Sequence, residues 1–331
     1  SDLLSLFDCG ARMSTETICV VGCSGFVGSH VTAALLSRGY NVHGTLRDSS
    51  GDNARWLMSD VAAAASGANT LTLFSADVFD KASLKPAMSG CTGVIVCAGS
   101  PVVAPETIDL MVAVAENVSD AAIEMGFGRA VFTSSTGSTN PPEGEPDLKN
   151  EDLHWSDPEL QFETGKFAAV GKTRLDRIVL AKMAASDGAF RVCVINPSMI
   201  VGPAYQPEPV TSLVRVAAIL NGERFADKIP NNSTSIIDVR DLADLHINAL
   251  ENDQASGRYF GVKQSWHWRD ILKALERAHP AYTMIQPDPD EVPVRATQFD
   301  LTRQNTLGVN VRGIDDMFAG LVAELNRRKM I

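Results

Sequence analysis

Residues 20–30 read VVGCSGFVGSH and place three glycines, Gly22, Gly25 and Gly28, directly after an apolar run. The apolar run is typical of a buried strand, and residues 26–39 have the spacing of a helix that ends in glycine. Glycines at this spacing allow a tight turn, close approach of a phosphate to the main chain, and close packing of the helix on the strand. The N-terminus of the helix offers free N–H groups to the phosphates. The stretch therefore predicts the pyrophosphate-binding turn of a dinucleotide site.

Strand-like and helix-like patterns alternate from this turn onward. The strand-like runs are apolar at consecutive positions, which is typical of strands covered on both faces. Such alternation predicts an α/β fold with a Rossmann-type doubly wound parallel sheet. The expected strands cover residues 17–22, 40–48, 70–78, 92–99, 129–135 and 191–198, and the expected helices cover residues 26–39, 80–90, 106–126 and 167–185.

The end of the second expected strand indicates which dinucleotide is bound. NAD enzymes usually carry an acid there, which holds the ribose 2′-hydroxyl. This chain has Arg47 instead, 25 positions after Gly22 (47 − 22), where a guanidinium can bind a 2′-phosphate. Arg55 is a candidate second cation, and the alternative is that Arg47 only pairs with Asp48 or Asp52 on the surface. We expect NADP.

Further cofactor contacts are expected where the next strands end. Asp77 follows the third strand and is placed to meet the adenine edge, while Ala98 and Gly99 follow the fourth and are small enough to let the cofactor pass. The cofactor site predicted from this part of the chain consists of Gly22, Ser24, Gly25, Phe26, Val27, Gly28, Arg47, Arg55, Asp77, Val78, Ala98 and Gly99.

The rhythm of strands and helices breaks after Pro203, where proline- and asparagine-rich stretches begin. Residues 1–15 are expected to be an N-terminal extension or a cloning remnant, and residues 16–203 an NADP-binding Rossmann domain. Residues 204–331 are expected to form mainly a smaller, irregular substrate-binding part, with segments near 235–262 returning to the Rossmann domain. Because ligands of such sheets bind at the carboxyl ends of the strands, this part is expected to cover the substrate.

Composition excludes several classes of partner. The 331 residues are 45% hydrophobic and carry a formal net charge of −11, so neither nucleic acid nor an anionic membrane is an expected partner. No apolar run reaches the length of a bilayer span, and a cytoplasmic location is expected. The six cysteines are expected to be reduced thiols, although Cys23 lies inside the glycine turn, where a reactive thiol is conceivable. The six histidines lack metal-ligand spacing, so no metal is expected.

Short motifs in matching order over most of the chain resemble the extended short-chain dehydrogenase/reductase superfamily, and within it the dihydroflavonol reductase and cinnamoyl-CoA reductase group. The motifs are VVGCSGFVGSH (20–30), TLRD (45–48), SGCTGVIV (89–96), AVFTSSTGSTN (130–140), HWSDPE (154–159), GKT (171–173), INPSMIVGP (195–203), SIIDVRDLADLHINALE (235–251), GRYFGV (257–262) and FDLTRQNTLGV (299–309).

The resemblance implies a serine, a tyrosine and a lysine that act together on a carbonyl while the nicotinamide delivers hydride. Ser135, the last serine of the TSS run, matches the serine that hydrogen-bonds the substrate oxygen. Lys172 matches the lysine that holds the nicotinamide ribose and lowers the pKa of the tyrosine. Pro197 and Ser198 match the segment against the nicotinamide, and Asn140 matches a polar position in the substrate pocket.

The tyrosine of this pattern is absent. It would lie four residues before Lys172, and that residue is Ala168. Alanine cannot donate a proton, and it is expected to leave a ring-sized gap beside the nicotinamide. Either Ala168 is an engineered replacement in an otherwise active reductase, or the natural chain has lost its acid. The only tyrosines of the chain are Tyr40, Tyr205, Tyr259 and Tyr282.

The sequence therefore predicts an NADPH-dependent oxidoreductase that reduces a medium-sized aldehyde or ketone, with Met199 and Tyr205 lining its pocket and Ala168 at the position of the proton donor. A non-catalytic NADP-binding sensor or partner protein is one alternative. An epimerase or isomerase of the same superfamily is another, although it would usually need NAD, which Arg47 disfavours. The chain is expected to be a monomer or a homodimer.

Overall fold

The computed structural model describes residues 16–64, 69–100 and 103–331. The predicted N-terminal extension, residues 1–15 with Cys9, lies outside the described residues.

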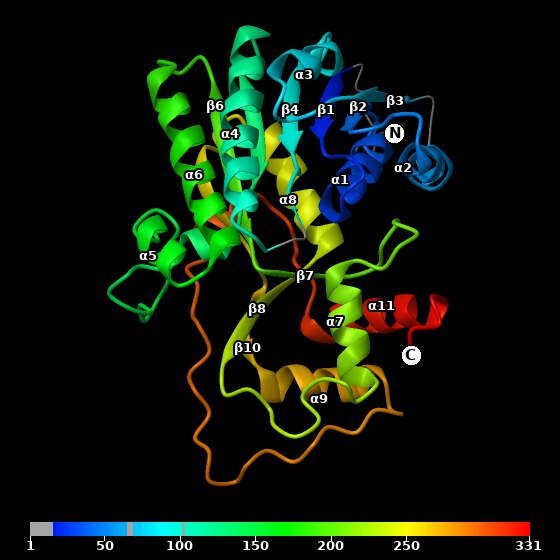
Figure 1. Ribbon diagram of the computed structural model, residues 1–331, viewed down its shortest axis with the longest axis vertical. Helices are drawn as coiled ribbons and strands as arrows, with labels where there is room; N and C mark the ends of the chain where they lie inside the picture. The colour runs from blue at the N-terminus through cyan, green and yellow to red at the C-terminus, as the bar shows by residue number, and fades with distance from the viewer. Residues whose placement is uncertain (1–15, 65–68, 101–102) are drawn as a thin grey trace, which may run out of the picture.

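The centre of the molecule is a seven-stranded sheet in which every neighbouring pair of strands is parallel (Figure 1). The Rossmann-type α/β fold predicted from the alternating apolar runs is thus confirmed. In spatial order the strands are β3 (Leu71–Ser75), β2 (Asn41–Leu46), β1 (Thr17–Val21), β4 (Gly93–Val96), β5 (Arg129–Thr133), β6 (Arg191–Pro197) and β9 (Gly257–Gly261).

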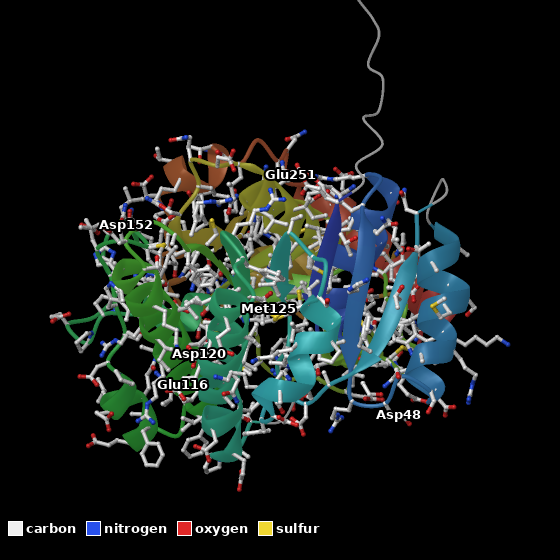
Figure 2. All side chains as sticks on the ribbon, turned by 90° about the horizontal axis from the view of Figure 1, so that it is seen from above. Asp48, Glu116, Asp120, Met125, Asp152 and Glu251 are labelled. Atoms are coloured by element: carbon white, nitrogen blue, oxygen red, sulfur yellow. The ribbon has the colours of Figure 1, made fainter. Side chains whose placement is uncertain are left out.

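Helices cover both faces of this sheet because its strands are apolar on both sides. In β1, Ile18 and Val20 point into one core, and Cys19 and Val21 point into the other. Figure 2 shows the sheet between the two layers, with Glu251 on one side and Asp120 on the other. The first core is closed by α1 (Phe26–Ser37) and α8 (Val239–Glu251), and the second by α3 (Lys81–Met88), α4 (Glu106–Glu124) and α6 (Phe167–Ala185).

The order of the strands creates a switch point between β1 and β4. The chain runs from β1 outward through β2 to β3 and then returns to β4 on the other side of β1. Val21 is in register with Thr45 of β2 and with Val96 of β4. The residues that follow these three strands therefore meet at one edge, which is where open α/β sheets bind their ligands.

The second half of the chain adds a smaller unit beyond the carboxyl ends of the strands (Figure 1). β6 leads through Ser198 directly into β7, while α8 and β9 return to the large sheet, where α8 packs on α1 and β9 pairs with β6. The small unit contains a three-stranded sheet of β7 (Met199–Val201), β8 (Ser233–Asp238) and β10 (Gln264–His267), together with α7 (Thr211–Leu220), α9 (Trp268–Ala278) and α11 (Ile314–Arg327).

No helix was predicted beyond residue 185, so α7, α8, α9 and α11 were not foreseen, and neither were three short helices. They are α2 (Asp52–Trp56), which continues into a π-helical turn at Leu57–Val61, α5 (Pro158–Glu163) and α10 (Thr302–Asn305). α5 begins directly after Asp157. The Asp157 carboxylate caps the helix by accepting hydrogen bonds from the N–H groups of Glu159 and Leu160, a role for which aspartate is a preferred residue. Among the described residues, no helix is both long and apolar enough to cross a membrane.

Candidate active site

Two glycines of the 20–30 turn are required by the packing of the chain itself. Gly22 follows β1 with φ +84°, and a Cβ atom there would lie 2.9 Å from the main chain of Ala98. A Cβ atom on Gly28 would lie 2.1 Å from the carbonyl oxygen of Gly22. A side chain at Gly22 would therefore push β1 away from the segment after β4. A side chain at Gly28 would push α1 away from the turn after β1.

Gly25 differs from these two, because the chain does not need a glycine there. It is exposed at the N-terminus of α1 with φ −74°, and an added Cβ atom would meet only the Gly22 carbonyl at an ordinary 3.4 Å. No side chain caps α1 and no acid lies in its first turn. The turn thus leaves main-chain N–H groups and a positive helix end open to an anion.

The other predicted residues of this turn contribute mainly to packing. Val27 is buried in the core and Phe26 lies edge-on to His30, while the Ser24 carbonyl accepts a 3.1 Å hydrogen bond from the side-chain amide of Gln206. Gln206 belongs to the small unit and also donates to Ser29. Sequence reasoning missed this link, because the two segments are 182 positions apart.

Cys23 is not a reactive thiol. Its side chain is buried, and its thiol lies 3.3 Å from the Thr45 carbonyl, to which it donates. Burial raises the pKa of Cys23 to about 12. The five described cysteines are all free.

Arg47 follows β2 as an exposed side chain. Among the described residues it makes no ion pair, and the two acids that could have neutralised it are engaged elsewhere. The Asp48 carboxylate accepts from the N–H and the hydroxyl of Ser50 at 2.9 and 2.7 Å, and Asp52 pairs with Arg55. The surface pairing considered for Arg47 is therefore absent from the structure, whereas Arg55 does have an acidic partner.

The segments after β3 and β4 lie at the same edge of the sheet. Asp77 is exposed, and its carboxylate accepts a 2.9 Å hydrogen bond from the N–H of Phe79. Asn117 of α4 donates to the carbonyl of Val78 at 2.8 Å. Ala98 touches the glycine turn, and Gly99 is exposed.

Lys172 and Ser135 both lie at the end of β5. The Nζ atom of Lys172, on α6, donates a 2.7 Å hydrogen bond to the carbonyl of Thr133. Ser135 begins a 3₁₀ turn, and its Oγ accepts a 3.0 Å hydrogen bond from the N–H of Gly137. Burial lowers the pKa of Lys172 to about 8, although the charge of Asp176 acts in the opposite direction.

Ala168 is the second residue of α6 and lies one helical turn before Lys172, so both are on the same side of the helix. None of the four tyrosines replaces a side chain at this position. Tyr40 donates to Glu251, Tyr205 lies 4.8 Å from the His30 ring, and the Tyr259 hydroxyl accepts from the N–H of Ser256. Tyr282 lies in the small unit, after α9.

A cavity of about 280 Å³ opens beside Ser135, between the large sheet and the small unit. Of the predicted substrate residues, Met199 lines it but Asn140 and Tyr205 do not. Asn140 is exposed and accepts a 2.6 Å hydrogen bond from Lys149. Tyr205 instead packs on α1 through His30. The cavity is lined by Ser135, Ser198, Met199, Arg215, Ile219, Arg224, Thr234 and Trp268.

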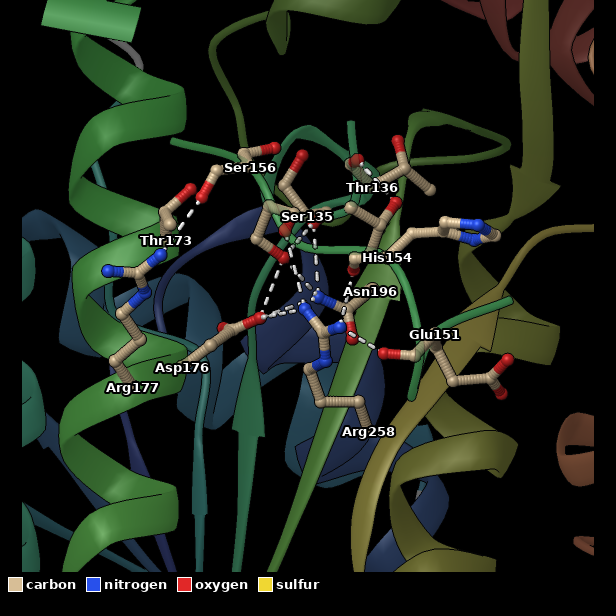
Figure 3. A network of polar contacts seen from close by, with 12 residues as sticks. Ser135, Thr136, Glu151, His154, Ser156, Thr173, Asp176, Arg177, Asn196 and Arg258 are labelled. Carbon is tan, nitrogen blue, oxygen red and sulfur yellow. Dashed lines mark hydrogen bonds and ion pairs between the residues drawn. The ribbon is translucent and has the colours of Figure 1, made fainter. Parts of the chain in front are cut away.

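A buried polar network fixes the main chain around Ser135 (Figure 3). The Asp176 carboxylate, one helical turn after Lys172, accepts from the Ser138 hydroxyl at 2.6 Å and from the Asn196 amide at 3.1 Å. The same amide donates to the Ser135 carbonyl at 3.0 Å. Asp176 thus holds one end of the 3₁₀ turn directly, through Ser138, and reaches the other end through the amide of Asn196.

Arg258 supplies the positive charge of this network from β9. Its guanidinium is 1% exposed, lies 3.7 Å from Asp176, and is stacked 3.5 Å from the Trp155 ring centre. It also donates to the carbonyls of Glu151 and His154. Sequence reasoning missed Arg258 and Asp176, and the only signal was the placement of an acid one helical turn after Lys172. No group of residues suited to a metal ion occurs in the described part of the chain.

Comparisons with known proteins identify the family of this chain. Residues 18–261 match the family described as the NAD dependent epimerase/dehydratase family. Cinnamoyl-CoA reductase 1 of Oryza sativa subsp. japonica is 34% identical over 296 residues, which cover 87% of this chain and 83% of that protein. Dihydroflavonol 4-reductase of Callistephus chinensis is 27% identical over 326 residues, which cover 93% and 86%.

Solved structures support the fold. Vestitone reductase from alfalfa (Medicago sativa) superposes with a TM-score of 0.80 at 23% identity, covering 95% of this chain and 99% of that one. A yeast methylglyoxal/isovaleraldehyde reductase, solved with NADPH, superposes with a TM-score of 0.79 at 19% identity, covering 95% and 100%. The chain therefore belongs to the NAD dependent epimerase/dehydratase family of extended short-chain dehydrogenases/reductases, and within it to the group of cinnamoyl-CoA and dihydroflavonol reductases, as its motifs predicted.

Proposed function

We propose that this chain has the active site of an NADPH-dependent carbonyl reductase in which alanine stands at the position of the proton donor. The observation on which the proposal rests is that the Lys172 ammonium group and Ser135 both lie at the end of β5. This is the same edge of the sheet at which the glycine turn leaves the N-terminus of α1 without a side-chain cap. The relatives with similar sequences are named as reductases.

The residues at the sheet edge fit NADP. The fold would tolerate a side chain at position 25, but the residue there is glycine. The absence of a side chain suits the close approach of a pyrophosphate to the main chain. Arg47 follows β2 without an acidic partner among the described residues, which suits a 2′-phosphate. Asp48 would be the acid for a ribose 2′-hydroxyl, but its carboxylate is engaged by Ser50. This arrangement disfavours an NAD-dependent epimerase or isomerase.

When bound, the nicotinamide supplies the hydride. Ser135 would bind the substrate carbonyl, because its Oγ accepts from Gly137 and its own hydrogen remains free to be donated. Lys172 would exchange its contact with the Thr133 carbonyl for the nicotinamide ribose. Pro197 and Ser198, at the end of β6, would lie against the ring. The positive charge of Lys172 would favour a phenolate at position 168, which alanine cannot provide.

A non-catalytic NADP-binding protein is the second candidate, and Ala168 is the observation that favours it. Hydride transfer to a carbonyl creates an alkoxide that needs a proton, and none of the tyrosines lines the cavity beside Ser135. We expect this chain to bind NADPH and to reduce carbonyls slowly or not at all. General acid catalysis contributes about 10²–10⁴-fold in rate.

The test compares the chain with Ala168→Tyr and Ala168→Phe, using NADPH consumption with a panel of aldehydes and ketones. The phenylalanine variant is the matched control, because it fills the same space without a hydroxyl. A rise in turnover of at least about 100-fold for tyrosine alone supports the reductase. If all three proteins bind NADPH and none reduces any carbonyl of the panel, the non-catalytic role replaces it.

A further inference from the structure

Two arginines line the cavity beside Ser135, and the proposed reductase mechanism uses neither of them. Arg215 lies on α7, and Arg224 lies in the turn that follows this helix. Within residues 16–64, 69–100 and 103–331, neither guanidinium has an acidic partner. Both side chains are exposed, and together they make one side of the cavity positive in a chain whose net charge is −11.

Arg224 is held in place by its surroundings. Its guanidinium lies 4.8 Å from the ring centre of Phe225, and this ring packs edge-on against Trp268, also at 4.8 Å. The N–H groups of Glu223 and Arg224 both donate to the carbonyl of Ala218, which closes the end of α7. Phe225 itself has φ +59°, a conformation that phenylalanine rarely adopts. The stack therefore orients an exposed positive charge at the edge of the cavity.

The other residues that line the cavity indicate which further groups the ligand carries. Met199, Ile219 and Trp268 are apolar, whereas Ser135 and Thr234 offer hydroxyl groups. The volume of about 280 Å³ corresponds to roughly nine water molecules, which suits a small molecule with one apolar group. An anion bound here would satisfy both arginines through charge-assisted hydrogen bonds.

We propose that Arg215 and Arg224 bind a carboxylate of the substrate, so that the carbonyl compound accepted here is an oxo acid with an apolar body. This assignment rests on the proposed function, since it places the carbonyl at Ser135. The carboxylate would lie at the arginines and the apolar body against Trp268 and Ile219.

We expect Ala168 to prevent rapid turnover, so that binding of a reactive carbonyl can be measured at equilibrium on the chain as it stands. The experiment titrates 2-oxo-4-phenylbutanoate, or its methyl ester, into the NADPH complex and measures the dissociation constant by calorimetry. The proteins are the unchanged chain, Arg215→Gln, Arg224→Gln and the double variant. Arg295→Gln is the matched control, because Arg295 is an exposed arginine that pairs with Asp147 and does not line the cavity.

The acid is expected to bind the unchanged chain at least about tenfold more tightly than the ester. The double variant should lose this preference while its affinity for the ester stays the same, and the Arg295 variant should keep it. Equal binding of acid and ester overturns the proposal, as does a preference that survives in the double variant or a failure of the acid to bind. Displacement of the acid by coenzyme A alone would assign the arginines to phosphates and overturn the carboxylate assignment.

These outcomes are separate from the test of the proposed function. If the acid binds through the arginines but Ala168→Tyr reduces no carbonyl, the anion site stands and the reductase does not. If Ala168→Tyr reduces neutral ketones as well as oxo acids, with no effect of the arginine variants, the reductase stands and the carboxylate assignment fails.

Discussion

The Nζ atom of Lys172 donates a 2.7 Å hydrogen bond to the carbonyl of Thr133, two residues before Ser135. This contact fixes a helical lysine at the end of β5 and removes it partly from water. Burial accordingly lowers the pKa of Lys172 to about 8, well below the usual value of about 10.4. In the proposed function this ammonium group holds the nicotinamide ribose, so the binding of the anionic cofactor and the protonation of Lys172 should be coupled.

The first prediction follows from this coupling. Below pH 8 the free protein already carries the charge on Lys172, whereas above pH 8 a proton must be taken up when NADPH binds. The affinity for NADPH should therefore be constant from pH 6.5 to 7.5 and fall by up to about tenfold per pH unit above pH 8. Fluorescence titration of NADPH across this range measures it. The Lys172→Gln variant should bind more weakly and lack this step, and an identical pH profile for both proteins would contradict the role of Lys172.

The glycine turn gives a second prediction, since Gly25 and Gly28 are glycines for different reasons. Gly25→Ala should change the free energy of unfolding by less than about 1 kcal/mol, because the new Cβ atom meets only one atom at 3.4 Å. It should weaken NADPH binding at least about tenfold by blocking the approach of the pyrophosphate. Gly28→Ala should instead destabilise the protein, because its Cβ atom would lie 2.1 Å from the Gly22 carbonyl.

Urea unfolding and NADPH titration separate these two effects. A Gly25→Ala protein that binds NADPH normally would mean that the cofactor does not approach this turn. A Gly28→Ala protein of normal stability would contradict the close contact between α1 and the turn after β1.

Local patterns of the sequence predicted the sheet and the glycine turn, but contacts between distant segments could not be predicted. The parallel sheet and the turn were recognisable because apolar strands and glycine spacing are local patterns, and the order of the motifs indicated the family. The network of Asp176 and Arg258 was not, because it joins residues 82 positions apart (258 − 176). In the sequence, Asp176 looks like any other polar residue of a helix, and Arg258 looks like any residue near the start of a strand. Only the folded structure shows that both are buried.

Two of the three predicted substrate residues, Asn140 and Tyr205, do not line the cavity, and a related reason applies to Tyr205. Tyr205 was expected in the pocket, but its ring packs against the His30 ring of α1, with the ring centres 4.8 Å apart. Arg215 was not singled out, because an exposed arginine on a helix is usually just a solvated charge. Only the closure of the small unit over the carboxyl ends of the strands brings Arg215 to the same cavity as Ser135.

The third prediction concerns the choice of cofactor. Arg47→Gln should weaken NADPH binding by about 10- to 100-fold and leave NADH binding nearly unchanged, because only NADPH carries the 2′-phosphate. Arg55→Gln should have a smaller effect, since Asp52 already pairs with Arg55 in the free protein. Dissociation constants for both nucleotides in the three proteins provide the measurement. A loss of affinity for both nucleotides in Arg47→Gln would place Arg47 elsewhere than at the 2′-phosphate.

The last prediction is that the network around Arg258 is a large contributor to stability. Arg258→Ala would leave the Asp176 carboxylate buried without its cation and free the carbonyls of Glu151 and His154. Breaking a buried pair in this way costs about 3–5 kcal/mol, whereas an exposed pair contributes about 0–1 kcal/mol. Urea unfolding of Arg258→Ala should show the larger loss, and Arg295→Ala, which breaks an exposed pair with Asp147, should show the smaller one. Similar losses in the two variants would mean that Arg258 is not the centre of the network, because water or a rearranged turn would then replace its contacts at little cost.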